Sequence, residues 1–408
     1  MSKAPSIILI DVSGPDRPGV TASLSSILSA HEINILDIGQ AVIHNSLPLG
    51  ILIEAPANNA PVLKDILFRA HELGIELRFT PIESDEYETW VQAQGKARYI
   101  VTLLARRISA GHIARLTTII ADNGLNIDGI NRLSGRVSLS GDSAPDPDTT
   151  RACVQFSVRG VPADIDIMRR EFLDTARDLG VDIAFQKDDV FRRTRRLVCF
   201  DMDSTLIQVE VIDELARRAG VGDQVSAITE AAMRGELDFT QSFRKRVGLL
   251  KGLDESVLQE IAEGLPLTEG AERLISTLKR LGYKTAILSG GFNYFGRYLQ
   301  KLLGIDYVYA NELDIKDGKV TGEVTGQVVD GARKAELLRE IAGREGLRLE
   351  QVIAVGDGSN DLPMISLAGL GIAFRAKPIV KASAEQAITT LGLDGILYLI
   401  GVRDRDFE

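Results

Sequence analysis

The sequence predicts an α/β protein in which a doubly wound parallel sheet with a small helical cap follows two smaller domains of the order βαββαβ. From residue 197 onward apolar strands alternate with helical patterns, which is typical of a parallel sheet covered on both faces. The preceding part repeats one layout of strand, glycine-containing turn, amphipathic helix and strand. The length of 408 residues also favours several domains over one.

The first copy of the repeat is predicted over residues 1–85. A strand at Ser6–Val12 leads through a turn that ends at Gly19 into a helix at Val20–His31. The other predicted elements are strands at 33–35, 41–44, 50–54 and 76–81 and a helix at 61–73. This succession is the split βαβ order of ferredoxin-like domains.

The second copy is predicted over residues 98–187. Gly111 and Asn126 stand at the same offset from Gly19 and Asn34, which indicates an internal repeat. Its predicted strands are 99–104, 125–127, 151–159 and 182–186, and its helices are 112–123 and 163–179. An acidic linker is predicted at 86–97, and the segment Leu139–Thr150, rich in Ser, Gly, Asp and Pro, is predicted to be a long hairpin loop.

The third domain is predicted over residues 188–408, with a helical insertion at 209–267. Its predicted strands are 197–201, 284–288, 352–355 and 370–374. In open parallel sheets ligands bind in the crevice at the carboxyl ends of the strands. Polar residues that follow these strands are therefore the first candidates for a functional site.

Composition and charge exclude several classes of protein. With 47 Lys and Arg against 57 Asp and Glu, the net charge is −10, which disfavours nucleic acid as a partner. The apolar runs are too short to span a membrane, and the start lacks the pattern of a signal peptide, so a cytoplasmic location is expected. Cys153 and Cys199 provide no basis for a disulfide framework or a zinc site. The four histidines all lie at or before His112, so the third domain has no histidine of its own for catalysis.

The first candidate segment is an apolar strand that ends in two aspartates, Asp201 and Asp203. Because they are two residues apart, both lie on the same side of an extended chain. The carboxylate of Asp201 can attack phosphorus, while Asp203 can protonate the leaving oxygen and later activate water. This pair predicts phosphoryl transfer through a covalent intermediate on Asp201.

Three further segments carry groups that suit a phosphate ester. The hydroxyl of Ser289 and the backbone amide of Gly290 can bind phosphate oxygens at close range. The ammonium of Lys334 can neutralise charge between the nucleophile and the phosphoryl group. Asp357 and Asp361 follow a buried strand, and carboxylates beside a phosphate call for a hard cation, for which magnesium fits best.

These four segments, in this order, resemble the motifs of the haloacid dehalogenase superfamily. The resemblance covers the chain from about residue 197 onward. It implies that Asp201 is the nucleophile and Asp203 the general acid and base. It also implies a magnesium ion held by Asp201, the backbone carbonyl of Asp203 and Asp357, with Asp361 close by.

Within that superfamily, the insertion at 209–267 resembles the small cap of the phosphoserine phosphatase family. The resemblance implies that Glu210 contacts the substrate ammonium, that Phe239 covers the site and that Arg246 pairs with the substrate carboxylate. An amino-acid zwitterion needs one charge of each sign in its pocket. Asn360 matches a further contact on the phosphate side. The implied reaction is hydrolysis of O-phospho-L-serine to L-serine and phosphate.

The two N-terminal repeats resemble ACT-type regulatory domains, which bind amino acids at interfaces between copies. In the first copy the turn that contains Asp16, Arg17 and Gly19 matches the effector loop of that family, and Asn34 and Asp37 follow on the next strand. The second copy lacks the Asp-Arg pair, which argues against effector binding there. The resemblance implies an amino-acid effector, with serine as the first candidate, and a homodimer.

Other interpretations of the same residues are open at this point. Taken alone, the two aspartates would fit a solvated turn, Glu210 and Arg246 a solvated helix face, Phe239 an ordinary core position, and residues 14–19 a simple Pro-Gly turn. The chain could also act on another small phosphate ester, or could be an amino-acid sensor without activity. The complete set of four motifs argues against the sensor.

One further pattern is a false lead. Cys153 and Arg159 have the Cys-x5-Arg spacing of thiol phosphatases. Those sites need a glycine-rich loop that holds the phosphate at a helix N-terminus. The segment here alternates apolar and polar residues, as a strand does.

Overall fold

The computed structural model describes residues 6–136 and 149–406. The chain divides into two compact units, one that ends at Lys96 and one that begins at Ala97. Within the described residues, no helix is long and apolar enough to cross a membrane.

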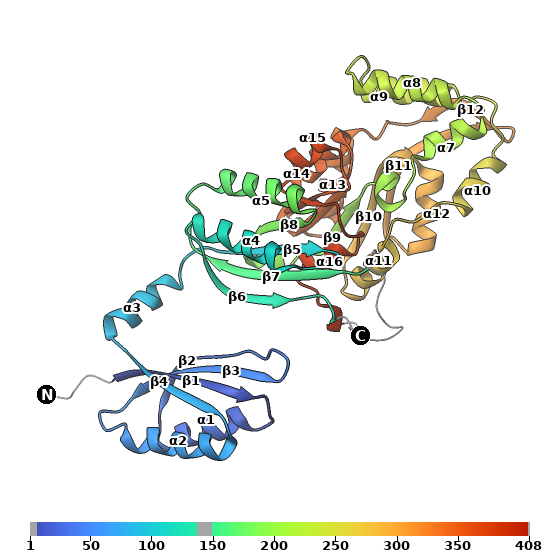
Figure 1. Ribbon diagram of the computed structural model, residues 1–408. Coiled ribbons are helices and arrows are strands. Elements are labelled where there is room, and N and C mark those ends of the chain that lie inside the picture. The colour runs from blue at the N-terminus through green and yellow to red at the C-terminus, as the bar shows by residue number, and fades with distance from the viewer. Residues whose placement is uncertain (1–5, 137–148, 407–408) are drawn as a thin grey trace. The chain divides into compact units, whose positions relative to one another are not determined.

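The first unit is an antiparallel sheet with two helices on one face (Figure 1). The sheet order β2-β3-β1-β4 is that of a ferredoxin-like βαββαβ domain, as predicted. Side chains of β1 alternate, so that Ile8, Ile10 and Val12 are buried with the helices. The elements are β1 (Ser6–Pro15), α1 (Val20–Ala30), β2 (Asn34–Gln40), β3 (Ser46–Ala55), α2 (Ala60–Leu73) and β4 (Glu76–Ile82), and the acidic segment after them forms α3 (Ser84–Ala93).

The strand predicted at Ala41–His44 is wrong. These residues leave β2 and close a hairpin with β3, in which the backbones of Ile43 and Ser46 exchange two hydrogen bonds of 3.1 and 3.0 Å. His44 adopts a left-handed conformation with φ of 59°. A tight two-residue hairpin turn requires positive φ at its first residue, and such turn residues interrupt the strand that the apolar pattern suggests.

The second unit begins with a domain of the same topology, with sheet order β6-β7-β5-β8. Helices α4 and α5 cover one face of this sheet (Figure 1). Most of the predicted hairpin loop Leu139–Thr150 lies outside the described residues. The elements are β5 (Arg98–Ala105), α4 (Ala110–Asp122), β6 (Asn126–Arg132), β7 (Ala152–Arg159), α5 (Ile165–Leu179) and β8 (Asp182–Lys187).

The remainder of the second unit is built on a sheet with the order β12-β11-β10-β9-β13-β14-β15 among the described residues. All neighbours are parallel except β11 and β12. The strands predicted at 197–201, 284–288, 352–355 and 370–374 are present as β9, β10, β13 and β14. The strand bounds are β9 (Leu197–Phe200), β10 (Lys284–Phe292), β11 (Tyr307–Lys316), β12 (Lys319–Thr325), β13 (Val352–Gly356), β14 (Leu370–Phe374) and β15 (Gln386–Ile388).

Helices connect these strands and also fill the predicted insertion. Residues 209–267 contain α7 (Val211–Arg218), α8 (Gly222–Met233), α9 (Phe239–Gly248) and α10 (Ser256–Glu263). The other helices of this part are α6 (Val190–Arg193), α11 (Ala271–Arg280), α12 (Asn293–Leu303), α13 (Gly331–Arg344), α14 (Leu362–Leu367), α15 (Pro378–Ser383) and α16 (Gly395–Leu399).

The hairpin of β11 and β12 adds an antiparallel edge that the strand pattern does not predict. The turn between them has Asp317 at φ 51° and Gly318 at φ 72°. Asp-Gly with positive φ at both positions is the signature of a tight hairpin turn. A dipeptide signal for this hairpin was therefore available in the sequence.

The two sheets of the second unit share one core. Leu104, Leu133, Cys153 and Ala184 of the ferredoxin-like domain belong to the same buried cluster as Tyr398 and the apolar residues around it. At the seam the Gln386 side chain accepts a 2.9 Å bond from the backbone N–H of Phe185 and donates a 2.6 Å bond to its carbonyl. The sheet face that faces away from α4 and α5 is therefore covered by the larger domain.

Candidate active site

Asp201 lies at the carboxyl end of β9, in the middle of the parallel sheet. Its backbone N–H donates a 2.9 Å hydrogen bond to Val355, which continues the ladder between β9 and β13. The residue is 7% exposed, and its Oδ1 accepts a 2.8 Å bond from the N–H of Met202. Because β10 and β13 flank β9 on opposite sides, Asp201 lies at the topological switch point of the sheet, which is where open α/β sheets bind ligands.

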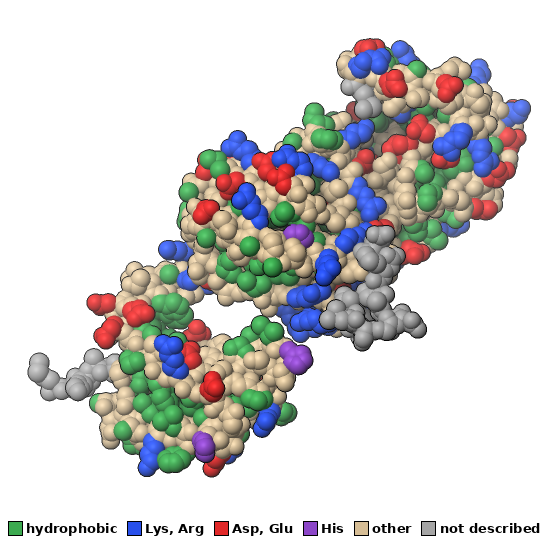
Figure 2. Space-filling model, in the orientation of Figure 1, with side chains coloured by type: hydrophobic (Ala, Val, Ile, Leu, Met, Phe, Trp, Pro, Cys, Tyr) green, Lys and Arg blue, Asp and Glu red, His purple; other side chains and the backbone are tan. Residues whose placement is uncertain are grey.

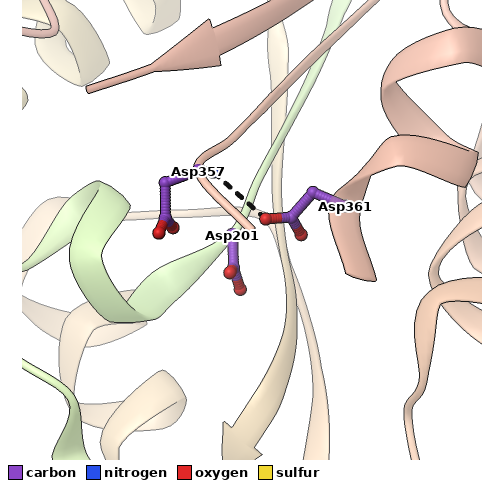
Figure 3. Close-up of side chains that lie close together, drawn as sticks. All are labelled: Asp201, Asp357 and Asp361. Atoms are coloured by element: carbon purple, nitrogen blue, oxygen red, sulfur yellow. Dashed lines mark hydrogen bonds between the residues drawn. The ribbon is translucent and has the colours of Figure 1, made fainter. Parts of the chain in front are cut away.

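Asp357 and Asp361 come from the turn after β13 and face Asp201 (Figure 3). The Oδ2 atom of Asp361 accepts hydrogen bonds of 3.1 Å from Asp357 N and 2.9 Å from Gly358 N, which holds the turn closed. One carboxylate oxygen from each of the three aspartates lies within 4.8 Å of the others. The structure thus brings together carboxylates that are more than a hundred residues apart in sequence.

Lys334 is the counter-charge of this cluster. Its side chain on α13 is completely buried, and its Nζ lies 2.8 Å from Asp201 Oδ1 and 2.6 Å from Asp361 Oδ1. A buried ammonium is stable only when it is paired and hydrogen-bonded, and two carboxylates meet that need here. The two contacts fix Lys334 beside the carboxylate that is the candidate nucleophile.

Asp203 is held by the backbone of Val211, the first residue of α7 in the cap. Its Oδ1 accepts a 3.0 Å bond from the N–H of Val211, and the side chain is 9% exposed. Between the two aspartates and the cap, Ser204 has φ of 56°, and its hydroxyl donates a 2.7 Å bond to Glu210. The cap residue Glu210 is therefore tied directly to the catalytic loop.

Ser289 and Gly290 lie where β10 bulges away from β11. The ladder shifts register between Leu288 and Phe292, so the intervening turn projects from the sheet edge. Ser289 is fully buried, and its Oγ accepts a 2.9 Å bond from Gly291 N. A Cβ atom at Gly291 would lie 2.3 Å from Asp203 Oδ2, so only glycine permits this approach.

The cap brings Phe239 and Arg246 from α9. A Cβ at Gly290 would lie 2.7 Å from Phe239 Cζ, which places the ring directly on the Ser289 turn. Burial lowers the pKa of the Arg246 guanidinium, and the charges of Glu210, Asp213 and Asp203 oppose that shift. In the described chain Arg246 Nε has no hydrogen-bond partner. Arg246 and Glu210 thus lie near Asp203.

Asn360 lies in the short helical turn Ser359–Asp361 beside the carboxylate cluster. Its side-chain oxygen would be 2.3 Å from a Cβ at Gly358, so this glycine lets the turn close on itself. The side chain is half-buried. Asn360 therefore lies next to Asp361 at the edge where the phosphate groups are predicted.

Burial and crowding of carboxylates raise the pKa values of Asp201, Asp203 and Asp357. Burial raises the pKa of Asp201 well above its ordinary value, and the charge of Asp361 adds to this. Burial, followed by repulsion from Glu210, raises the pKa of Asp203 to about 8. Burial and the Asp361 charge raise the pKa of Asp357 to about 7. Burial lowers the pKa of Lys334, but attraction to Asp201 and Asp361 outweighs burial, so this pKa is raised.

This donor set fits a divalent cation. Asp201, Asp203, Asp357 and Asp361 face a single ammonium, so the site carries an excess of negative charge. The raised carboxyl pKa values record the free-energy cost of that excess. Hard cations prefer carboxylate oxygens, and a cation between Asp201 and Asp357 would relieve the repulsion.

Two positions in the site have roles that the sequence did not predict. The hydroxyl of Thr205 donates a 3.2 Å bond to Asp357 Oδ1, which links the first and fourth motifs. Asn311, on β11, contacts the turn after Ser289. Thr205 stands within the first motif, so its position was a usable signal, whereas no local pattern marks Asn311.

The predicted effector residues lie in the first unit. Asp16, Arg17 and Gly19 are exposed on the turn before α1, and Gly19 has φ of 94°. Asn34 donates a 3.0 Å bond to Glu54, and the Asp37 carboxylate accepts a 2.9 Å bond from Ile38 N. In the part of the chain that the structure describes, no hydrogen bond joins the turn to Asn34 or Asp37.

Comparison with known families assigns both parts of the chain. A family model for haloacid dehalogenase-like hydrolases matches residues 198–366. A model for the ACT domain matches residues 6–80. These matches confirm the fold class that the sequence predicts. The domain that begins with β5 has the same strand order as the part matched by the ACT model.

Curated relatives are similar over nearly the whole chain. A phosphoserine phosphatase of Streptomyces coelicolor is 42% identical over 98% of this chain and 93% of its own length. A phosphoserine phosphatase of Mycobacterium tuberculosis is 38% identical over 98% of this chain and 94% of its own length.

Solved structures show the same fold. A hydrolase of the haloacid dehalogenase family from Salmonella enterica serovar Typhi aligns with a TM-score of 0.63 at 29% identity, over 74% of this chain and 99% of that one. A probable phosphoserine phosphatase from Vibrio cholerae, in unliganded form, aligns with a TM-score of 0.58 at 34% identity, over 76% and 87% of the two chains.

Proposed function

Because the chain belongs to the phosphoserine phosphatase family of haloacid dehalogenase-like hydrolases, we propose that it hydrolyses O-phospho-L-serine through a phospho-aspartate on Asp201. The observation that carries the proposal is the buried carboxylate of Asp201 at the sheet switch point, 2.8 Å from the Lys334 ammonium. A phosphate ester bound there would contact the Asp201 nucleophile, the Lys334 ammonium and the Ser289 turn. The products are L-serine and inorganic phosphate.

In the proposed first step, an Asp201 carboxylate oxygen attacks phosphorus, and the bond from phosphorus to the serine oxygen breaks. The proton of Asp203 goes to that leaving oxygen, and the pKa of about 8 means that Asp203 holds a proton at neutral pH. In the second step Asp203 takes a proton from water, which attacks the phosphorus of the intermediate. Phosphate leaves and the Asp201 carboxylate is restored.

We propose magnesium as the cation, held by Asp201, the Asp203 carbonyl and Asp357, with Asp361 next to it. The ion would neutralise charge on the phosphoryl oxygens. The chain supplies the remaining counter-charge through Lys334, and the Ser289 hydroxyl and Gly290 amide would bind phosphoryl oxygens. Asp361 orients both Lys334 and the turn that carries Asp357.

Substrate selection is proposed to rest on the cap. Arg246 has an unpartnered Nε in the described chain and lies near Asp203, so its guanidinium is available for the serine carboxylate. Glu210 would take the ammonium, and Phe239 would close the site over the Ser289 turn. Asn360 would contact the phosphate side. A zwitterion fits these opposite charges better than a sugar phosphate does.

Regulation through the first domain is part of the proposal. An amino acid, with serine as the first candidate, would bind at the turn of Asp16, Arg17 and Gly19, together with Asn34 and Asp37. Figure 2 shows hydrophobic side chains on the surface of this unit, and exposed apolar residues of and after β2 support a homodimer. These are Ile35, Ile38, Val42 and Ile43, which are 42%, 48%, 45% and 74% exposed.

The cytoplasmic location and the domain limits at residues 85, 98, 187 and 188 stay predictions.

The deciding experiment is a panel of phosphate esters tested with magnesium, with and without added serine. We expect phosphoserine to be hydrolysed far faster than phosphoglycolate or sugar phosphates, because only phosphoserine offers both charges to the cap. Equal rates across the panel would leave a phosphatase but remove the substrate assignment. Unchanged rates with serine would count against regulation.

A further inference from the structure

The turn Ser289-Gly290-Gly291 lies inside β10, but its residues pair with neither β11 nor β9. The ladder of β10 with β11 breaks after Leu288 and resumes at the pair of Phe292 with Asn311. A bulge of this kind leaves backbone groups without strand partners. The orientation of its peptide groups must therefore come from elsewhere.

Asn311 supplies that orientation. Its side chain is 2% exposed, and its Nδ2 donates a 2.8 Å hydrogen bond to the carbonyl of Gly290. Its Oδ1 accepts a 2.9 Å bond from Val329 N. Because one partner is a carbonyl and the other an N–H, the amide can satisfy both in one orientation alone.

The hydrogen bond from Val329 connects Asn311 to the segment that carries Lys334, the partner of Asp201. Val329 directly precedes Asp330, which caps α13 by accepting a 2.8 Å bond from Arg333 N. Lys334 lies in the first turns of that helix and pairs with Asp201. A single amide therefore ties the Ser289 turn to the segment that positions Lys334.

Fixing the Gly290 carbonyl also fixes a donor. The carbonyl of Gly290 and the N–H of Gly291 belong to one trans peptide group, in which they point in opposite directions. That N–H points at Ser289 Oγ at 2.9 Å, on the side where Gly291 approaches Asp203 Oδ2. If this peptide rotated, its carbonyl would face the carboxylates.

We propose that Asn311 is a positioning residue for phosphoryl transfer, which holds the Gly290–Gly291 peptide so that its N–H donates to Ser289 Oγ and the Ser289 hydroxyl hydrogen faces the transferred phosphoryl group. The inference rests on the proposed phosphatase function of the Asp201 site. An oriented hydroxyl donor of this kind stabilises charge on the equatorial oxygens, and it acts only if its direction is set before the substrate binds.

The test is Asn311→Asp, which preserves shape and the bond from Val329 but replaces the donor with an oxygen that repels the Gly290 carbonyl. Loss of one preorganised donor costs about 10²-fold in kcat in related cases, and we expect a loss of that order with a smaller change in KM. Binding of orthovanadate, measured by calorimetry on the full chain, should weaken in parallel. The loss of kcat relative to the wild type should become smaller at low pH, because the introduced carboxyl group, once protonated, again offers a donor to the Gly290 carbonyl.

Thr321→Val on β12 is the matched control. It removes the Thr321 hydroxyl bonds to Asp314 on β11 and leaves the Ser289 turn untouched. We expect near wild-type kcat and vanadate affinity from it. If Asn311→Asp does not fold, Asn311→Ser removes the same donor without adding charge and should show the same loss.

Full activity and full vanadate affinity in both Asn311 variants would overturn the inference, and so would an equal loss in Thr321→Val. A pH-independent deficit in Asn311→Asp would also contradict it, because that is the behaviour of a merely structural defect. A wild-type chain that hydrolyses no ester would overturn the proposed function alone. The vanadate titration would still decide the role of Asn311 in that case.

Discussion

In the floor of the site, formed by Asp201, Asp203, Ser289, Lys334, Asp357 and Asp361, the buried ammonium is paired with two carboxylates. The cap also has ion pairs, but within the described residues none of them includes Arg246. Lys334 and Asp361 are fully buried, and Lys334 Nζ lies 2.6 Å from Asp361 Oδ1. Arg246 of the cap is half-buried and, within the described residues, makes no ion pair. The floor is therefore organised before any ligand arrives, while the cap keeps its charge free for one.

This difference separates chemistry from specificity. A preorganised floor can serve any phosphate monoester, because it contacts groups that all of them share. Free charges in the cap discriminate between esters, because a substrate without a carboxylate leaves Arg246 unpaired. Variants in the two regions should consequently fail in different ways.

The largest effect is expected from Asp201→Asn in the floor. An amide cannot form the covalent intermediate, so kcat should fall by about 10⁴-fold or more on every ester, whatever the cap binds. Steady-state phosphate release measures this. The matched control is Asp254→Asn, the same change on an exposed turn of the insertion, which should leave kcat unchanged. Substantial turnover by Asp201→Asn would remove the proposed mechanism.

A second floor variant tests stability. Lys334→Met leaves Asp201 and Asp361 as buried charges without their partner, which costs about 3–5 kcal/mol in comparable buried pairs. Urea unfolding without divalent cation should show this loss. Lys245→Met on the exposed face of α9 should change stability by less than about 0.5 kcal/mol. Equal stability of the two variants would show that the floor is not preorganised by this ion network.

The cap is tested by Arg246→Ala. Loss of a charged hydrogen bond to the substrate carboxylate is worth about 1.5–3 kcal/mol, which is about 10- to 150-fold in kcat/KM for phosphoserine. An ester without a carboxylate should lose little. Arg244→Ala, on the exposed side of the same helix, is the control. An equal loss on both esters would place Arg246 in the general chemistry and break the distinction between floor and cap.

The smallest effect expected is the pH dependence of stabilisation by magnesium. The pKa values of about 8 for Asp203 and about 7 for Asp357 exceed the ordinary 3.8 of an aspartate. At pH values between the ordinary pKa and these raised ones, the folded protein therefore binds more protons than the unfolded chain. The site's contribution to metal-free stability therefore decreases as pH rises through 7 and 8.

Magnesium should offset this loss, so the increase in melting temperature on adding magnesium should be larger at pH 8.5 than at pH 5.5. Differential scanning calorimetry at matched ionic strength measures it. Asp357→Asn should abolish most of the difference between the two pH values. An increase that is independent of pH would mean that these carboxylates do not hold the ion.

Much of this protein follows from its sequence. Three of the four motifs lie at the end of an apolar strand, and strand ends meet at one edge of a parallel sheet, so the convergence of Asp201, Ser289 and Asp357 is predictable. The internal repeat likewise predicts two domains of one topology, because the periodicity of each segment determines its local structure. The strand predicted at Ala41–His44 failed because turn residues overrode an apolar run.

Only the tertiary structure decided contacts between segments without a shared pattern. Asn311 meets Gly290 because β11 is placed beside the bulge of β10. The second ferredoxin-like sheet is covered because Gln386 and its neighbours pack on it. Arg106 and Glu269, joined by two bonds of 2.8 Å, are likewise brought together only by folding. The sequence by itself determined the floor's chemistry, since motif and strand end are local. Packing determined which distant side chains, such as Asn311, support the floor, since these side chains become neighbours only when the sheets are assembled.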